Sequence, residues 1–128
     1  MIEISREPLR PDVNISKVRD KSYGAVVVFV GSVREMSNDG KKVVCLDYDL
    51  GAEELARSKL QAIADELKAR FDIGQVAIAH RLGRLEVGEL TSVFAISSVH
   101  RQQAFEAAQF ALDRFKEVTP LWEKEITE

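Results

Sequence analysis

A histidine and an arginine, His100 and Arg101, stand together where an apolar segment typical of a buried strand gives way to a helix-like segment. Free backbone N–H groups at the start of a helix favour an anion, and these two side chains would add hydrogen-bond donors and positive charge. The chemistry that this pair predicts is anion binding. The alternative is a surface turn with Arg101 in water, and the local pattern favours neither interpretation.

Other basic residues stand at the ends of predicted elements. Arg34 follows the strand-like segment VVVFVGSV, in which Gly31 either lets the backbone approach another group closely or ends the strand. Lys116 is at the C-terminal end of a predicted helix, where a lysine commonly complements the helix dipole. His80 and Arg81 end an apolar strand next to a turn. On the local pattern alone, a structural role is favoured at all four basic positions.

The residue types argue against a metal centre, a bound cofactor and cysteine chemistry. Cys45 is the only cysteine, which excludes an internal disulfide and a cysteine-based zinc site, and its apolar neighbours favour an inert core residue. The two histidines lie in different elements without a flanking carboxylate pattern. Gly83 and Gly88 have the spacing that opens a phosphate loop, but Glu89 stands where a lysine is needed. We therefore expect no metal and no cofactor.

The composition is typical of one soluble globular domain over residues 1–128. Hydrophobic residues make up 45% of the chain and charged residues 30%, which is the balance of a folded protein. The net charge of −3 argues against a nucleic-acid binder and leaves room for a local basic pocket. The longest apolar run, residues 25–30, is far shorter than the roughly 20 residues of a membrane span, and no secretory signal is visible. We expect a cytoplasmic protein that binds neither nucleic acid nor membrane.

Hydrophobic periodicity predicts the elements that would position the basic residues. The polar segment SNDG at 37–40 is typical of a turn and would join two strands as a hairpin. Segment 83–89 is interpreted as a turn, and the residues after Pro120 as a short amphipathic tail. Strands are expected over residues 2–6, 24–30, 42–49, 75–82 and 90–99, and helices over residues 12–19, 52–71 and 101–118.

Both long helices have an apolar face that would pack on a sheet. Asp12 would cap the short first helix. The order of the elements lacks the regular alternation of a doubly wound parallel sheet, so the predicted fold class is α+β, with largely antiparallel sheets and two main helices. The apolar faces comprise Ala56, Leu60, Ile63, Leu67 and Phe71 in one long helix, and Ala104, Phe105, Ala108, Leu112 and Phe115 in the other.

Four segments resemble, in their order and spacing, the large catalytic subunit of molybdopterin synthase, which is the MoaE family. They are FVGSVR at 29–34, HRLGRLEVGE at 80–89, SSVHRQQAFEAAQFALDRFK at 97–116 and TPLWEKE at 119–125. The block from 80 to 125 is the most specific part, because it joins several motifs in one fixed order. The resemblance covers about residues 24–125 and implies a fold similar to the α/β-hammerhead.

The resemblance also implies an activity, that of a sulfurtransferase in molybdenum cofactor biosynthesis. Enzymes of this family convert cyclic pyranopterin monophosphate into molybdopterin by installing the dithiolene sulfurs. The sulfur arrives as a thiocarboxylate on the C-terminal Gly-Gly tail of a small β-grasp subunit, so the large subunit needs no catalytic cysteine. The large subunit forms a homodimer that carries one small subunit at each end, which makes a heterotetramer.

Roles for single residues come from matching the family's motifs to this chain. Arg34, His100 and Arg101 match positions that hold the phosphate and the pterin of the substrate. Ser32 and Val33 fall in the same substrate-binding segment as Arg34. Lys116 matches the lysine beside the incoming glycine tail, where it would be catalytic.

The segment after Trp122 departs from the family, which usually has a lysine at the next position. Here the order is Glu123, Lys124, Glu125, and we expect all three near the substrate. A carboxylate would repel an anionic substrate, so we expect Lys124 to turn into the pocket as a second catalytic lysine. Glu123 would then face solvent or pair with a basic residue such as Lys41 or Lys42.

Other interpretations of Lys124 and of the whole chain remain open. Lys124 could be a solvated surface residue in a weak enzyme. The chain could be a non-catalytic paralogue that binds the small subunit or the pterin without turnover, or an unrelated anion-binding module.

The predicted site residues also imply that one chain is not enough. Arg101 and Lys116 stand near opposite ends of one predicted helix. At 1.5 Å per residue their backbones would lie about 22 Å apart, too far to surround one small pterin. We therefore expect a pocket that takes His100 and Arg101 from one protomer and Lys116 from the other.

Overall fold

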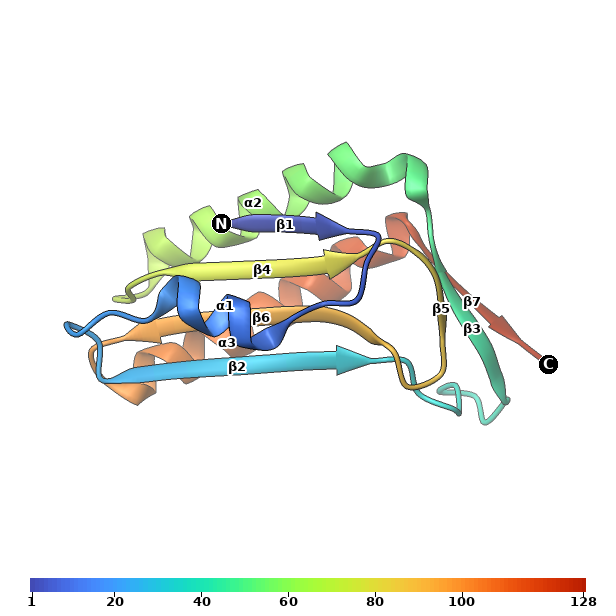
Figure 1. Cartoon of the computed structure of the whole chain (residues 1–128), viewed down its shortest axis with the longest axis horizontal. Helices are drawn as coiled ribbons and strands as arrows, with labels where there is room; N and C mark the ends of the chain where they lie inside the picture. Colours follow the sequence, from blue (N-terminus) through green and yellow to red (C-terminus); the bar gives the residue numbers. More distant parts are fainter.

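The structure is a computed structural model that describes residues 1–128 (Figure 1). Every strand and helix that the periodicity predicts is present, with small shifts at the ends. The strands are β1 (Ile2–Ser5), β2 (Ala25–Ser32), β3 (Val43–Tyr48), β4 (Val76–Arg81), β5 (Gly83–Glu86), β6 (Leu90–Ser98) and β7 (Glu123–Thr127). The helices are α1 (Pro11–Val18), α2 (Glu53–Arg70) and α3 (Arg101–Val118), with short 3-10 turns η1 (Leu50–Ala52) and η2 (Thr119–Leu121). None of the helices combines the length and the apolar composition that a membrane crossing needs.

The larger of two sheets has the strand order β1-β4-β6-β2. β1 is parallel to β4, and the other two neighbouring pairs are antiparallel. Figure 1 shows α1 in front of this sheet and α3 behind it. Because helices cover both faces, the central strands β4 and β6 are buried along nearly their whole length.

The two faces of this sheet carry side chains of different size. Ile78 and Phe94 belong to the main core beneath α2 and α3. Ala77 and Ala95, their neighbours in the strands, point to the opposite face and pack against Val18 of α1. Small side chains on that face let the short helix α1 lie close to the sheet.

The smaller sheet has the strand order β5-β3-β7 and is antiparallel throughout. It crosses one end of the larger sheet at a steep angle (Figure 1). Tyr48, Leu85 and Trp122 belong to a second hydrophobic core behind this sheet, which also includes Ala56 of α2. The α+β class with largely antiparallel sheets is thus confirmed, and the second sheet forms the head of the hammerhead.

The predicted hairpin between β2 and β3 is wrong. β2 pairs with β6, whereas β3 pairs with β5 and β7, so the two strands belong to different sheets. The segment between them does turn, with Gly40 at a φ of 82° and one antiparallel bridge between Met36 and Lys42. This loop connects the two sheets and borders the space between them.

Two predicted details of the helices are also wrong. Phe105 was expected in the core, but it is 60% exposed. The helix faces the sheet with a stripe of alanines, and Phe105 falls outside this stripe. Asp12 does not cap α1, because the N-cap is Arg10 and the Asp12 carboxylate instead pairs with the Arg10 guanidinium at 2.9 Å. The alanine stripe comprises Ala104, Ala107, Ala108 and Ala111.

Candidate functional site

A cavity of about 460 Å³ lies where the larger sheet, α3 and the smaller sheet meet. Its walls come from the adjoining ends of β2 and β6, the last turns of α3, η2, the loop after β2, and strands β3 and β7. Of the nine residues predicted for the site, six line this cavity: Ser32, Val33, Arg34, Lys116, Glu123 and Glu125. The other three, His100, Arg101 and Lys124, do not.

A close approach of two strands shapes one wall of the cavity. A Cβ on Gly31 would lie 2.9 Å from Thr91 Oγ1 and 3.0 Å from Ser92 Oγ, so a larger residue would displace these two hydroxyl side chains. Of the two predictions for Gly31, the structure thus favours the one in which its backbone lies close to another group, here the Thr91 and Ser92 side chains. The register of the pair shifts between Gly31 and Ser32, which marks a bulge where the chain leaves the sheet.

Backbone hydrogen bonds then fix the segment that carries Arg34. The amide of Val33 donates to the carbonyl of Glu89 at 3.0 Å, and the amide of Gly88 donates to the carbonyl of Val33 at 2.8 Å. Val33 is 3% exposed. Arg34 Nη2 donates to Asn38 Oδ1 at 2.8 Å, and both side chains line the cavity. The turn at 37–40 therefore holds the guanidinium at the cavity.

Lys116 reaches the same cavity from the last turn of α3. The alanine stripe described above packs this helix against the sheet, which brings its C-terminal end to the junction of the two sheets. Two cationic side chains that are far apart in the sequence, Arg34 and Lys116, thus meet at one cavity. An arrangement of this kind can bind an anionic group.

Strand β7 forms the opposite wall and turns its carboxylates inward. Glu123 pairs in register with Tyr48, and the Tyr48 hydroxyl donates to Glu123 Oε1 at 2.7 Å. Burial, together with the charge of Glu123, raises the pKa of Tyr48 well above its usual range, so this hydroxyl remains a donor. Glu125, two residues on, lines the cavity from the same face of the strand.

The expected orientation of Lys124 is therefore wrong. Successive residues of a strand point to opposite faces, so placing Glu123 and Glu125 in the cavity turns Lys124 away from it. Lys124 borders a separate hollow on the other face of the small sheet, beside Asp47, its register partner on β3. Glu123 bonds to Tyr48 and forms no ion pair with Lys41 or Lys42.

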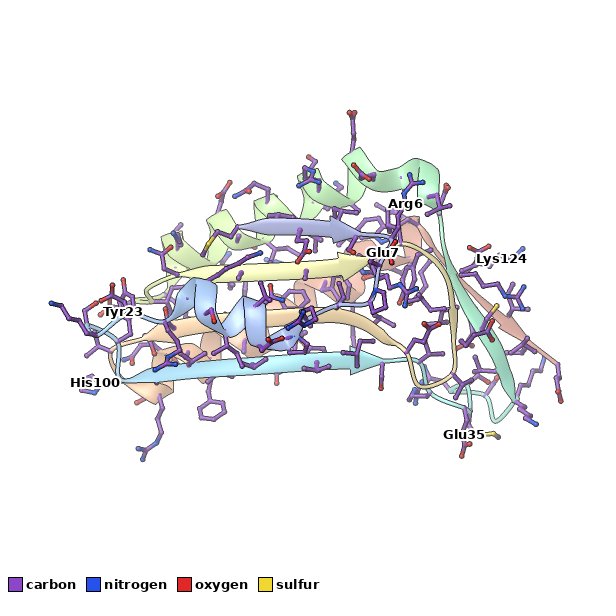
Figure 2. All side chains as sticks on the ribbon, in the orientation of Figure 1. Arg6, Glu7, Tyr23, Glu35, His100 and Lys124 are labelled. Carbon is purple, nitrogen blue, oxygen red and sulfur yellow. The ribbon has the colours of Figure 1, made fainter.

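His100 and Arg101 lie far from this cavity. His100 is the N-cap of α3, and Arg101 begins the helix that ends just after Lys116. Figure 2 shows His100 at one end of the molecule and Lys124, on the small sheet, at the other. Both His100 and Arg101 are exposed. Arg101 and Lys116 thus stand near opposite ends of α3, as their spacing predicts, and of the two only Lys116 lines the cavity.

The charge balance of the cavity differs from the expected basic pocket. The cationic side chains that line it are Arg34 and Lys116, whereas Asp113, Glu123 and Glu125 are acidic. In one chain the lining therefore carries one more acidic than basic group. No cluster of three or more His, Cys, Asp or Glu side chains is placed to hold a metal ion.

Sequence reasoning missed a buried histidine behind the cavity wall. His80 was interpreted as a polar strand end, but its side chain is fully buried and both ring nitrogens have partners. Burial lowers the pKa of His80 to about 4. No local pattern signals this burial, because the partner of His80 is Trp122, which lies 42 residues further along the chain. Arg81, its neighbour, does pack a loop as predicted, through an ion pair with Glu89 at 2.7 Å.

Comparison with known proteins gives a consistent result. The family model described as MoaE protein matches residues 4–118. The molybdopterin synthase catalytic subunit of Bacillus subtilis (strain 168) is 40% identical over 126 residues, which cover 98% of this chain and 79% of that protein. The protein of the same name from Halalkalibacterium halodurans is 37% identical over 122 residues, which cover 95% of this chain and 77% of that protein.

A solved structure agrees in fold as well as in sequence. The crystal structure of molybdopterin synthase from Staphylococcus aureus superimposes with a TM-score of 0.86 at 37% identity, covering 98% of this chain and 90% of that one. The segments that resemble the family, around Arg34, His80, Lys116 and Glu123, form or support the walls of the cavity. With its hammerhead arrangement and this extent of identity, the chain belongs to the MoaE family.

Proposed function

We propose that this protein is the catalytic subunit of a molybdopterin synthase. It transfers sulfur from the thiocarboxylated Gly-Gly tail of a small β-grasp subunit to cyclic pyranopterin monophosphate, and so forms the dithiolene of molybdopterin. The observation that carries this proposal is the meeting of Arg34 and Lys116 at one cavity in a chain of the MoaE family.

The cavity is suited to a small, partly anionic ligand. Its volume of about 460 Å³ is within the usual range of small-molecule sites, roughly 300–1,000 Å³. Arg34 and Lys116 bind the phosphate and the tail carboxyl, with Ser32 and Val33 beside them. Glu123 and Glu125 face the ligand from β7, where carboxylates accept hydrogen bonds from ring N–H groups and weaken the binding of anions.

A second copy of the chain completes the cavity. Its His100 and Arg101 add positive charge and donors, which offset the acidic groups of the first copy. A two-fold dimer makes two equivalent pockets, each built from both chains. One small subunit docks at each end, giving the heterotetramer.

Lys116 is the group that acts on the reacting atoms. The thiocarboxylate sulfur bonds to the pterin, and water then attacks the acyl carbon so that the acyl C–S bond breaks and the tail leaves as a carboxylate. The Lys116 ammonium stabilises the oxyanion that develops in this attack, or it moves a proton in the same step. Lys124 lies on the other face of β7 and has no route to these atoms without a one-residue shift of the strand.

Reconstitution tests this function. The purified chain is mixed with a thiocarboxylated small subunit and cyclic pyranopterin monophosphate, and molybdopterin is measured. We expect product that depends on both partners. No product with the partner bound would support the non-catalytic paralogue, which the carboxylate of Glu123 at the cavity favours. No product and no binding of a β-grasp protein would leave only an anion-binding module.

A further inference from the structure

The ring of His80 is enclosed where the two sheets meet, directly behind the cavity wall. Tyr48 of β3 and Phe115 of α3 lie against it edge-on, with ring centroids at 4.8 Å and 5.3 Å. Trp122, at the end of η2, lies at 6.0 Å. Tyr48 and Phe115 also line the cavity. One imidazole on β4 thus contacts several separate segments that build the site.

The hydrogen bonds of His80 define its tautomer. Trp122 Nε1 lies 2.9 Å from His80 Nε2, and an indole N–H can only donate, so Nε2 is the acceptor. His80 Nδ1 lies 2.8 Å from the carbonyl oxygen of Thr91, which can only accept, so Nδ1 carries the proton. A protonated ring would present a second donor to the indole N–H. Only the neutral Nδ1–H form satisfies both partners.

Trp122 is the residue that leads into β7. Its carbonyl accepts from the amide of Asp49 at 2.9 Å, which starts the pairing of β7 with β3. β7 is an edge strand with β3 as its only neighbour. The placement of Glu123, the next residue, therefore depends on how firmly Trp122 is held.

We propose that His80 is a positioning residue for the cavity: its neutral ring holds Trp122, and through Trp122 it fixes the strand that presents Glu123 and Glu125. His80 does not line the cavity itself. Its effect on turnover rests on the function proposed above, whereas its effect on β7 does not.

The surroundings keep the His80 ring neutral at ordinary pH. The groups that face the ring are Tyr48 from β3, Phe115 from α3, Trp122 just after η2 and the Thr91 carbonyl from β6. Of these only Tyr48 titrates, and its pKa is raised by burial. The nearest charge along this network is Glu123, which bonds to the far side of Tyr48. Burial holds the pKa of His80 at about 4.

The tautomer can be tested on the unaltered protein. Long-range ¹⁵N–¹H NMR spectra of histidine-labelled protein at pH 6.5 distinguish the two neutral forms and the cation. The chain has two histidines, so His100→Gln assigns the His80 signals. We expect His80 neutral with the proton on Nδ1. The Nε2–H form or the cation at this pH would overturn the proposal.

Two matched amide substitutions separate the two hydrogen bonds. In His80→Gln the side-chain oxygen can replace Nε2 as the acceptor for Trp122. In His80→Asn the shorter amide can keep the bond to Thr91 but leaves the indole N–H without a partner. Hydrogen exchange of the backbone amides at residues 123–127 measures how stably β7 is paired. Exchange of the amides of Ile78 and Phe94 measures the stability of the larger sheet.

We expect β7 to exchange about fivefold faster in His80→Asn than in His80→Gln, since the loss of one buried hydrogen bond costs on the order of 1 kcal/mol. Amides of the larger sheet should respond alike in both variants. Equal exchange of β7 in the two variants would overturn the proposal. In the reconstituted assay we expect His80→Asn to raise the KM for the pterin and His80→Gln to keep it near that of the unaltered chain. If the unaltered chain makes no product, exchange and NMR still decide this inference.

Discussion

Lys116 and Lys68 make a matched pair at the residue scale. Both stand in the last turn of a long helix, where each complements the helix dipole, but only Lys116 lines the cavity. We expect Lys116→Ala to lower molybdopterin formation by a factor of ~10²–10⁴, the usual contribution of a positioned proton-transfer group. Lys68→Ala should leave it unchanged. Thermal unfolding of both variants checks that the fold is kept, and near-normal turnover by Lys116→Ala would remove this lysine from the mechanism.

Glu123 offers a test of charge inside the cavity. A carboxylate ~6 Å from a bound anion at an effective dielectric of ~20 opposes binding by up to about 3 kcal/mol, less where water reaches the site. Glu123→Gln removes the charge but keeps an oxygen that can accept from Tyr48. We therefore expect the KM for the phosphorylated pterin to fall by about tenfold.

Two comparisons make this test specific. Glu54→Gln removes the same charge from an exposed position on α2, and it should not change the KM. Lys124→Ala should also leave product formation unchanged, because its side chain lies on the other face of β7. A strong loss of turnover in Lys124→Ala would mean that the strand shifts by one residue during catalysis.

Packing between elements makes the stability of the fold depend on pH. The pKa of His80 is lowered to about 4 in the folded chain, whereas an unfolded histidine titrates near 6.5. Below about pH 6.5 the unfolded chain binds the proton first, so the free energy of unfolding falls as the pH falls towards 4, by at most about 3 kcal/mol from this group.

Urea unfolding at several pH values between 7.5 and 4.5 measures this effect. The variant His80→Gln, which cannot titrate there, should show a flatter dependence of unfolding free energy on pH. Identical slopes for the variant and the unaltered chain would mean that His80 is not buried in its neutral form.

Elements with a strong apolar period could be predicted from the sequence, and those defined by their partners could not. The buried residues of α2 recur at helical spacing, and β6 is a continuous run of buried residues that includes Val93, Phe94 and Ile96. β5 has one buried residue, Leu85, and β7 has none, so only their pairing with β3 makes them strands. The same limit explains the wrong hairpin, since strand partners lie outside any local pattern.

The candidate site shows the same division. Arg34 and Lys116 could be predicted because the resemblance marks them, and the cavity brings them together. The predicted orientation of Lys124 was wrong because the pairing of Tyr48 with Glu123 decides which side chains of β7 face the cavity. The role of His80 depends on Trp122, whose contact with it spans distant segments.

At the scale of the whole molecule, the predicted site residues fall into two groups at opposite ends of α3. One chain contributes Arg34, Lys116 and the carboxylates of β7 to a cavity with an excess of acidic groups. The exposed His100 and Arg101 at the other end are free to serve a second copy. A shared pocket explains both the distance along α3 and the charge balance.

Mixed dimers test this central claim most directly. Arg101→Ala and Lys116→Ala chains, each inactive as a homodimer, are co-expressed with different tags and assayed for molybdopterin. In a random mixture half of the dimers contain both chains, and one of their two pockets then has an intact Arg101 and an intact Lys116. We expect about a quarter of the unaltered activity, concentrated in the doubly tagged fraction. Activity no higher than that of the two variants assayed separately would contradict a catalytic pocket shared between two chains.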